Sequence, residues 1–112
     1  MSRCRRCEPV PEEVRRVADL LERRWTLSII FVALGGEQRF NVLLDSVPGI
    51  SPRMLSERLR DLERAQVIER RVLPDSPPAV VYGLTPGGRR LGPLIEALAR
   101  YAAESSASEL VS

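Results

Sequence analysis

The sequence predicts a mainly α-helical domain of the α+β class, with one amphipathic helix placed between a tight turn and a β-hairpin. Three observations support this expectation. Leucines recur at helical spacing along residues 50–65, ISPRMLSERLRDLERA. Pro48 and Gly49 interrupt the chain immediately before this segment. Two runs rich in β-branched residues, 67–73 and 80–84, enclose a proline-rich loop after it.

Length and composition limit both the fold and the chemistry. A chain of 112 residues is enough for a single domain. Only two Phe, two Tyr and one Trp are present, so we expect a core of Leu, Val, Ile and Ala. Histidine is absent, which removes the usual general base and the commonest metal ligand, so we expect no enzyme. We also expect no cofactor and assign no metal site. No apolar run approaches the roughly 20 residues of a membrane span, so we expect a cytoplasmic protein without a membrane partner.

The N-terminal third predicts a flexible arm followed by two helices. Residues 1–10 carry Arg and Cys without periodicity, which is typical of an arm. Pro11 and two following glutamates mark the start of the first helix. Residues 25–34, WTLSIIFVAL, are almost wholly apolar and predict a buried central helix that the following glycines end. The apolar face of the first helix consists of Val14, Val17, Ala18 and Leu21.

Two short elements lead to the amphipathic helix. Residues 38–40 predict a very short strand, and Asn41 is expected to cap a helix that runs to about Val47. After the turn, Ser51 is a good N-cap, and Pro52 at the first helical position needs no N–H partner. We therefore expect two helices joined by a tight turn.

The helix after the turn has two chemically different sides. Its apolar stripe faces a core, while the opposite side carries arginines and one carboxylate, with Ser56 on the flank. Such a side suits a DNA major groove, where guanidiniums contact guanine edges or phosphates and a carboxylate contacts cytosine. A solvated surface, with ion pairs along the helix, is the alternative. The stripe is Leu55, Leu59 and Leu62, and the opposite side is Arg53, Glu57, Arg60 and Arg64.

The C-terminal third completes the fold. The strands at 67–73 and 80–84 predict a β-hairpin directly after the amphipathic helix. Thr85 then caps a final helix that starts at Pro86 and continues to about Ala103. Together these elements predict a winged helix-turn-helix with a two-stranded wing over residues 11–104, followed by a flexible tail at 105–112.

Three motifs occur in the order found in one family. They are LLERRWTLSII, RFNVLLDSVPGISPRMLSERLRDLE and VIERRVLPDSPPAVVYGLTPGGRRL. Over residues 14–101 the chain resembles the HxlR family of bacterial transcription regulators, winged helix-turn-helix proteins related to the MarR type. The resemblance implies a homodimer, held by the first and last helices, that binds a pseudo-palindromic operator as a repressor or an activator, of which we expect the former.

The dimer also has support from the residues themselves. The last helix carries a long apolar stripe at the end of the chain, where a small single domain has little left to cover it. A two-fold axis would place two recognition helices about one turn of DNA apart. The stripe consists of Leu91, Leu94, Ile95, Leu98 and Tyr101.

The resemblance also implies positions for the DNA contacts. The net charge of +2 does not by itself indicate nucleic-acid binding. The evidence for DNA contacts is therefore where the arginines lie along the chain. Arg70 and Arg71 are neighbours in a strand, so only one of them can face DNA. Arg58 and Arg64 are expected to be solvated or in ion pairs. The groove-facing residues fall on Arg53, Ser56, Glu57 and Arg60, the residues near phosphates on Arg39 and Ser51, and those near the flanking backbone or minor groove on Arg70 and Arg71.

Cys4 and Cys7 form a C-R-R-C pair among three arginines, whose charge favours the reactive thiolate. Some members of the HxlR family sense oxidants or electrophiles through an N-terminal cysteine, which implies a thiol switch here. The family cysteine lies closer to the tryptophan, at about the place of Pro11. Two other readings stay open: four thiolates from a dimer suit zinc, and the arm can be an unremarkable reduced segment.

The main alternative function is a winged-helix module that contacts proteins, since the fold does not dictate the function. A module of that kind should lack a basic cluster on its second helix, whereas this helix carries three outward arginines. The sequence therefore favours DNA. It identifies neither the operator nor any small-molecule effector.

Overall fold

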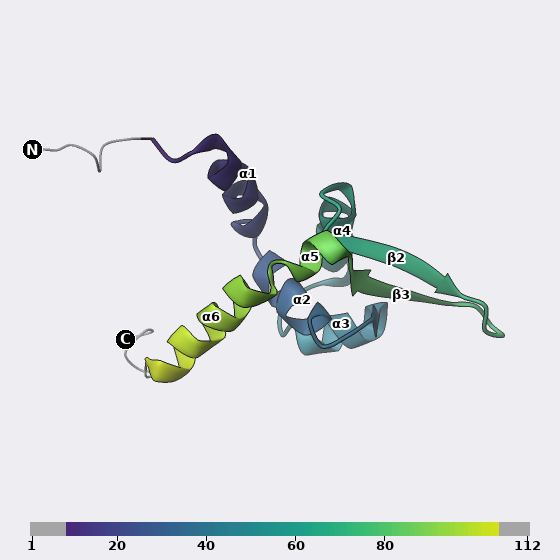
Figure 1. Ribbon diagram of the computed structural model, residues 1–112. Helices are drawn as coiled ribbons and strands as arrows, with labels where there is room; N and C mark the ends of the chain where they lie inside the picture. The colour runs from purple at the N-terminus through teal and green to yellow at the C-terminus, as the bar shows by residue number, and fades with distance from the viewer. Residues whose placement is uncertain (1–8, 106–112) are drawn as a thin grey trace, which may run out of the picture.

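The computed structural model describes residues 9–105, which form six helices and three strands. Cys4, Cys7 and the expected tail from 106 onward lie outside the described residues. The elements confirm the mainly helical α+β class (Figure 1). In chain order they are α1 (Glu12–Leu21), α2 (Thr26–Ala33), β1 (Gln38–Arg39), α3 (Phe40–Ser46), α4 (Pro52–Arg64), β2 (Ile68–Leu73), β3 (Ala79–Leu84), α5 (Pro86–Arg89) and α6 (Gly92–Glu104).

The core lies where α2, α3 and α4 meet the base of the hairpin. Its buried side chains are almost all aliphatic, as the composition predicts. Helix α2 is apolar nearly all round and lies at the centre, which explains why it tolerates no charged residue along its length. The fully buried side chains include Ile29, Ile30, Leu43, Leu55, Leu59, Leu62, Ile68 and Ile95.

The sheet has three antiparallel strands in the order β1-β3-β2. The hairpin β2–β3 extends away from the helices as the wing (Figure 1). The short strand β1 pairs with Val81 and Tyr82 of β3 as a third strand. The register places Arg39 and Arg71 on either side of Val81, because both are its antiparallel partners. The short strand expected before α3 is therefore part of the wing sheet.

Two predicted helix starts are wrong by one or two residues. Trp25 lies outside α2, in the left-handed region with φ 79°, where the chain reverses between α1 and α2. Asn41 is not a cap, because α3 already begins at Phe40, and Arg39 in the N-cap position makes no side-chain capping bond. The strand β1 runs directly into α3, which leaves no room for a cap at Asn41.

The predicted final helix is broken in two. Thr85 caps it as expected, accepting a hydrogen bond from the Gly88 N–H at 2.9 Å, but α5 ends at Arg89. The physical reason is Pro93, which lacks an N–H to donate and whose ring would collide with the carbonyl of Arg89. The chain restarts as α6 at Gly92.

Helices α1 and α6 extend from the core, into which α6 inserts Ile95 and against which Leu21 at the end of α1 packs. Helix α1 contains no fully buried residue, and Val14 and Val17 of its predicted apolar face stay exposed. Figure 1 shows α1 and α6 extending on the side opposite the wing. Within residues 9–105 no helix combines the length and hydropathy required to cross a bilayer.

Candidate nucleic-acid interface

The turn before α4 fixes how this helix leaves the core. Gly49 has φ 92°, a conformation that favours glycine, and a Cβ there would lie 3.2 Å from the Trp25 ring. Ser51 Oγ then accepts a hydrogen bond from the Met54 N–H at 3.1 Å, and Pro52 is the first helical residue. The predicted cap and helix start are confirmed.

The two predicted sides of α4 are also present. Leu55, Leu59 and Leu62 are buried in the core. On the other side Arg53 and Arg60 are exposed, and Arg53 keeps 90% of its side chain accessible. The outer side therefore presents Arg53 and Arg60 to solvent, and the Glu57 carboxylate lies 3.6 Å from the Arg53 guanidinium. Ser56 and Glu57 are half-buried at its edge.

A single carboxylate, Asp61, gathers arginines from two segments. Arg23 approaches it at 3.0 Å, Arg58 at 2.5 Å and Arg64 at 3.2 Å. Partial burial opposes ionisation of Asp61, but hydrogen bonds from Arg23 and Arg58 outweigh it and hold its pKa below the ordinary value. Arg58 and Arg64 are thus in ion pairs, as expected. Neither belongs to the residues predicted to face the DNA groove.

The same cluster ties α4 to the segment between α1 and α2. The Arg58 Nε donates to the carbonyl of Arg24 at 3.0 Å, and the Arg24 guanidinium lies 4.5 Å above the centre of the Trp25 ring. Because Trp25 also touches the turn at Gly49, the start and the middle of α4 are attached to one segment. This arrangement holds the outer side of α4 in a fixed orientation.

The wing arginines occupy different faces of the sheet. Arg70 is paired with Tyr82, while Arg71 is paired with Val81 and therefore shares the face of Arg39. The expectation that Arg70 and Arg71 point to opposite faces agrees with this register. Strands are about 4.8 Å apart, which puts the backbones of Arg39 and Arg71 roughly 10 Å from each other.

Carboxylates accompany both arginines of this face. Glu37 accepts two hydrogen bonds from Arg71, at 2.9 and 2.5 Å, and these hold the pKa of Glu37 below its ordinary value. Asp75 at the wing tip lies 3.9 Å from Arg39. Sequence reasoning missed both acids, because they are far from their partners in sequence and only the fold brings them together.

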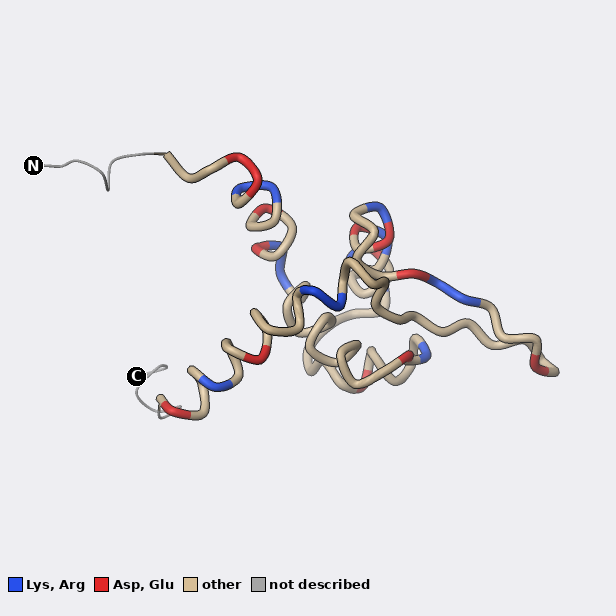
Figure 2. The backbone as a smooth tube through the Cα atoms, viewed as in Figure 1, with Lys and Arg blue, Asp and Glu red and all other residues tan. Residues whose placement is uncertain are grey.

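The structure thus brings the predicted residues together in two groups. The first lies on α4, where the chain alternates basic and acidic side chains, and the second lies on the sheet (Figure 2). Ser51 is at the start of α4 and is already engaged as a cap. The α4 group is Arg53, Ser56, Glu57 and Arg60, and the sheet group is Arg39, Arg70 and Arg71.

A helix-turn-helix with an exposed basic side on its second helix, followed by a β wing, defines a winged-helix DNA-binding protein. The sequence pattern of the HxlR-like helix-turn-helix family matches residues 20–109. The chain belongs to the HxlR family, and it is a DNA-binding transcriptional regulator of the helix-turn-helix type.

Relatives named as helix-turn-helix regulators agree with this assignment. YvaP of Bacillus subtilis, named an uncharacterized HTH-type transcriptional regulator, is 38% identical over 89 residues, which cover 80% of this chain and 82% of YvaP. YodB of the same organism is 40% identical over 83 residues, 74% of each chain.

Solved structures share the fold. The reduced form of YodB from B. subtilis superposes with a TM-score of 0.77 at 33% identity, covering 89% of this chain and 98% of YodB. The redox regulator HypR in its oxidised form gives a TM-score of 0.78 at 30% identity, covering 84% and 97%. The alternative of a protein-binding module has no comparable support among these relatives.

Proposed function

We propose that the chain is a sequence-specific repressor that binds a pseudo-palindromic operator as a homodimer, with α4 in the major groove. The observation that carries this proposal is the outer side of α4, on which Arg53 and Arg60 are exposed while the inner side is fixed in the core. An arginine recognises guanine by two parallel hydrogen bonds. Ser56 and Glu57 lie next to the arginines on α4, and we assign them to the neighbouring bases. A regulator of chromosomal DNA acts in the cytoplasm, which is the location we expect.

Apolar side chains on α1 and α6 support the homodimer. Val14 is 51% exposed and Leu98 is 47% exposed, with similar values along both helices. Several exposed apolar side chains on a small domain are typical of an interface. A second copy of the chain is the partner we propose, because a two-fold dimer places its two α4 helices about 34 Å apart, the half-site spacing of a palindrome.

Residues at the start of α4 and on the wing sheet provide the remaining proposed contacts to DNA. Ser51 and Arg39 are assigned to phosphates, and the wing arginines to the flanking backbone or minor groove. Since Arg70 and Arg71 lie on opposite faces, only one of them contacts DNA in a given complex. The face shared with Arg39 favours Arg71.

Substitution of Arg53 tests the groove assignment. An operator is first selected from a random DNA pool at about 100 mM salt. Arg53→Ala should then lose about 1–3 kcal/mol of discrimination at one base pair, roughly a five- to hundredfold change, because a bidentate guanine contact is removed. Competition titrations against operators mutated at single positions measure this loss.

The matched control is Arg64→Ala, which removes the same charge from the same helix but from an arginine outside the predicted groove contacts; Arg64 lies 3.2 Å from Asp61, and Arg53 lies 3.6 Å from Glu57. It should weaken binding to all sequences alike, if it weakens binding at all. Equal operator affinity and equal base preference for Arg53→Ala and the wild type would contradict the proposal that Arg53 contacts bases in the major groove.

A thiol switch at Cys4 and Cys7 is a second proposed property. It is favoured by the likeness to HypR, which is named a redox regulator, and by the arginines on either side of the pair. Mild oxidation should lower or raise operator affinity at least about threefold and the change should reverse with a reductant. Cys7→Ser should abolish the response, and an unchanged affinity of the oxidised wild type removes the switch.

A further inference from the structure

Two ion pairs join the wing to the segment before α3, and their charges are crossed. Residues 37–39 provide an acid and an arginine, while the wing provides Arg71 and Asp75. Each arginine therefore pairs with a carboxylate from the other segment. Arg39 and Arg71 are both register partners of Val81, so the three side chains lie on the same face of the sheet. Val81, between the two arginines, is only 6% exposed.

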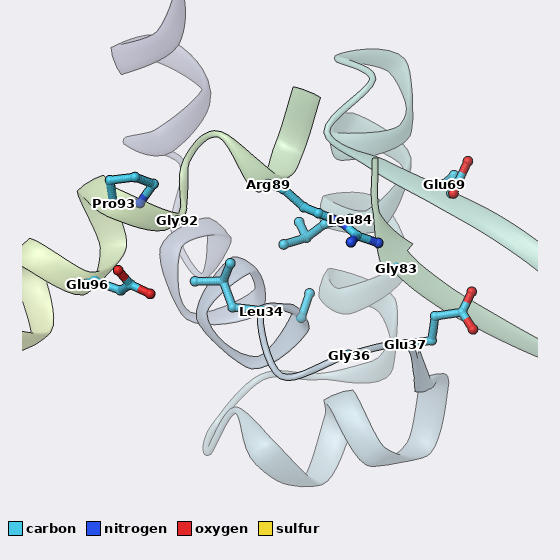
Figure 3. A pocket seen from close by; sticks show the side chains of 11 residues that line it. Leu34, Gly36, Glu37, Glu69, Gly83, Leu84, Arg89, Gly92, Pro93 and Glu96 are labelled. Atoms are coloured by element: carbon cyan, nitrogen blue, oxygen red, sulfur yellow. The ribbon is translucent and has the colours of Figure 1, made fainter. Parts of the chain in front are cut away.

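Gly83 allows the Glu37 side chain to lie across this face. Gly83 is two residues beyond Val81 on β3, and a Cβ there would lie 2.9 Å from the Glu37 Cγ. Figure 3 shows Glu37 beside Gly83, at the edge of a pocket of about 460 Å³. The absence of a side chain at position 83 thus gives Glu37 its route to Arg71 on the far strand.

Glu37 occupies hydrogen-bond donors of Arg71 that a DNA backbone would use, and Asp75 lies 3.9 Å from the Arg39 guanidinium. An arginine that donates two hydrogen bonds to a carboxylate presents less positive charge to a phosphate, and the carboxylate repels that phosphate. A phosphate must displace the acid before it takes its place on the guanidinium. The two acids are therefore in competition with DNA for the arginines of one face.

We propose that Glu37 and Asp75 are specificity-determining residues, internal counterions of Arg71 and Arg39 that lower the affinity of the protein for non-operator DNA. This inference rests on the proposed function of the chain as a sequence-specific DNA-binding protein. On an operator, base contacts from α4 hold the wing against the backbone, so the phosphates displace the acids. On other DNA the wing is not held, and the pairs stay closed.

The direct test is the affinity for a mixed-sequence duplex that contains no operator. Glu37→Gln and Asp75→Asn should each bind it about two- to fivefold more tightly than the wild type, the range expected for exposed ion pairs. The double variant should gain more. The dependence of affinity on salt should also steepen, by up to about one ion per site, because a freed arginine now contributes a full phosphate contact.

The matched control is Glu12→Gln. Glu12 also pairs with an arginine, Arg16 at 3.2 Å, but on α1 at the other end of the molecule, so this variant makes the same change in net charge (Figure 1). It should leave the affinity for non-operator DNA within about a factor of 1.5 of the wild type.

Gly83→Ala separates the ion pair from net charge. The added methyl group would lie 2.9 Å from the Glu37 Cγ, so the Glu37 side chain must shift, and we expect this shift to weaken its pair with Arg71 while the charge of the protein stays constant. This variant should bind non-operator DNA more tightly, in the same direction as Glu37→Gln. A thermal melt of every variant shows whether the wing sheet is still folded, and Asp75→Asn, at the exposed wing tip, provides the test if position 37 or 83 proves structural.

The outcomes are distinct. A wild-type protein that binds no DNA at low salt overturns the proposed function itself. A wild type that binds DNA, with folded Glu37→Gln and Asp75→Asn variants no tighter than Glu12→Gln, overturns only the role of the counterions.

Discussion

At the scale of single residues, Asp61 decides how α4 is held. Its carboxylate accepts contacts from Arg23, Arg58 and Arg64, and only 12% of its side chain is exposed. Arg58 is nearly as buried, so each charge depends on the other for compensation. The pairing of Asp61 with helix neighbours could be predicted from the spacing along α4. The approach of Arg23 could not, because it comes from a different segment.

We expect Asp61→Asn to lower the free energy of unfolding by about 1–3 kcal/mol, because it leaves Arg58, whose side chain is only 16% exposed, without its carboxylate. Urea denaturation at neutral pH measures the change. Asp45→Asn on α3 is the matched control, since Asp45 is exposed, and it should stay within about 0.5 kcal/mol of the wild type.

The pH dependence of this difference follows from the lowered pKa of Asp61. The group contributes stability above its ordinary value of 3.8, and this contribution is lost as the pH falls through the lower pKa of the folded state. The stability difference between the wild type and Asp61→Asn should therefore be full near pH 6 and shrink below about pH 4. A difference that stays constant down to pH 3 would contradict the assignment.

At the scale of elements, the junction between the wing and α6 depends on one close approach. A Cβ on Gly88 would lie 2.1 Å from the Val67 carbonyl oxygen, which belongs to the backbone and cannot move aside. The Thr85 N–H also donates to this oxygen at 3.0 Å, so α5 is seated on the start of β2. The sequence suggested a cap at Thr85 but not this contact, which requires knowledge of how α5 crosses the chain.

Gly88→Ala should destabilise the fold by about 1–3 kcal/mol or more, because α5 must separate from β2. Gly87→Ala is a matched control in the same short helix, where the added Cβ meets nothing closer than 3.7 Å. It should be neutral or stabilise by up to about 1 kcal/mol, since alanine is the better helix former. Equal melting temperatures for the two variants would show that the contact at Gly88 is not tight.

At the scale of the whole molecule, the described chain leaves its outer helices uncovered. Tyr101 is 59% exposed and Leu94 is 51% exposed on α6, while α1 buries none of its residues. Burial of such side chains contributes about 1.5–3 kcal/mol each when a partner covers them. The outward apolar side chains of α1 and α6 therefore lack packing within the described chain, although Ile95 of α6 is buried in the core.

Leu98→Glu should therefore convert a homodimer to a monomer at micromolar concentrations, because it places a charge in the centre of the proposed interface. Sedimentation equilibrium measures the mass, and circular dichroism shows that the helices remain. Arg100→Glu alters an exposed polar position on the same helix and should stay dimeric. A monomeric wild type at about 100 µM would refute the dimer.

The sequence by itself determined the order of the elements, the cap at Ser51, the inward leucines of α4 and the family, because these depend on neighbours within a few positions. Only the tertiary structure decided which arginines are held by partners from distant segments. The ion pair Glu37–Arg71 and the hydrogen bond from Arg58 to the Arg24 carbonyl each join residues 34 positions apart, so they follow from strand register and helix docking. The periodicity of the sequence does not predict contacts between residues so far apart. An exposed charged side chain is hydrated equally well in any strand register, and only the packing of the whole chain selects its partner.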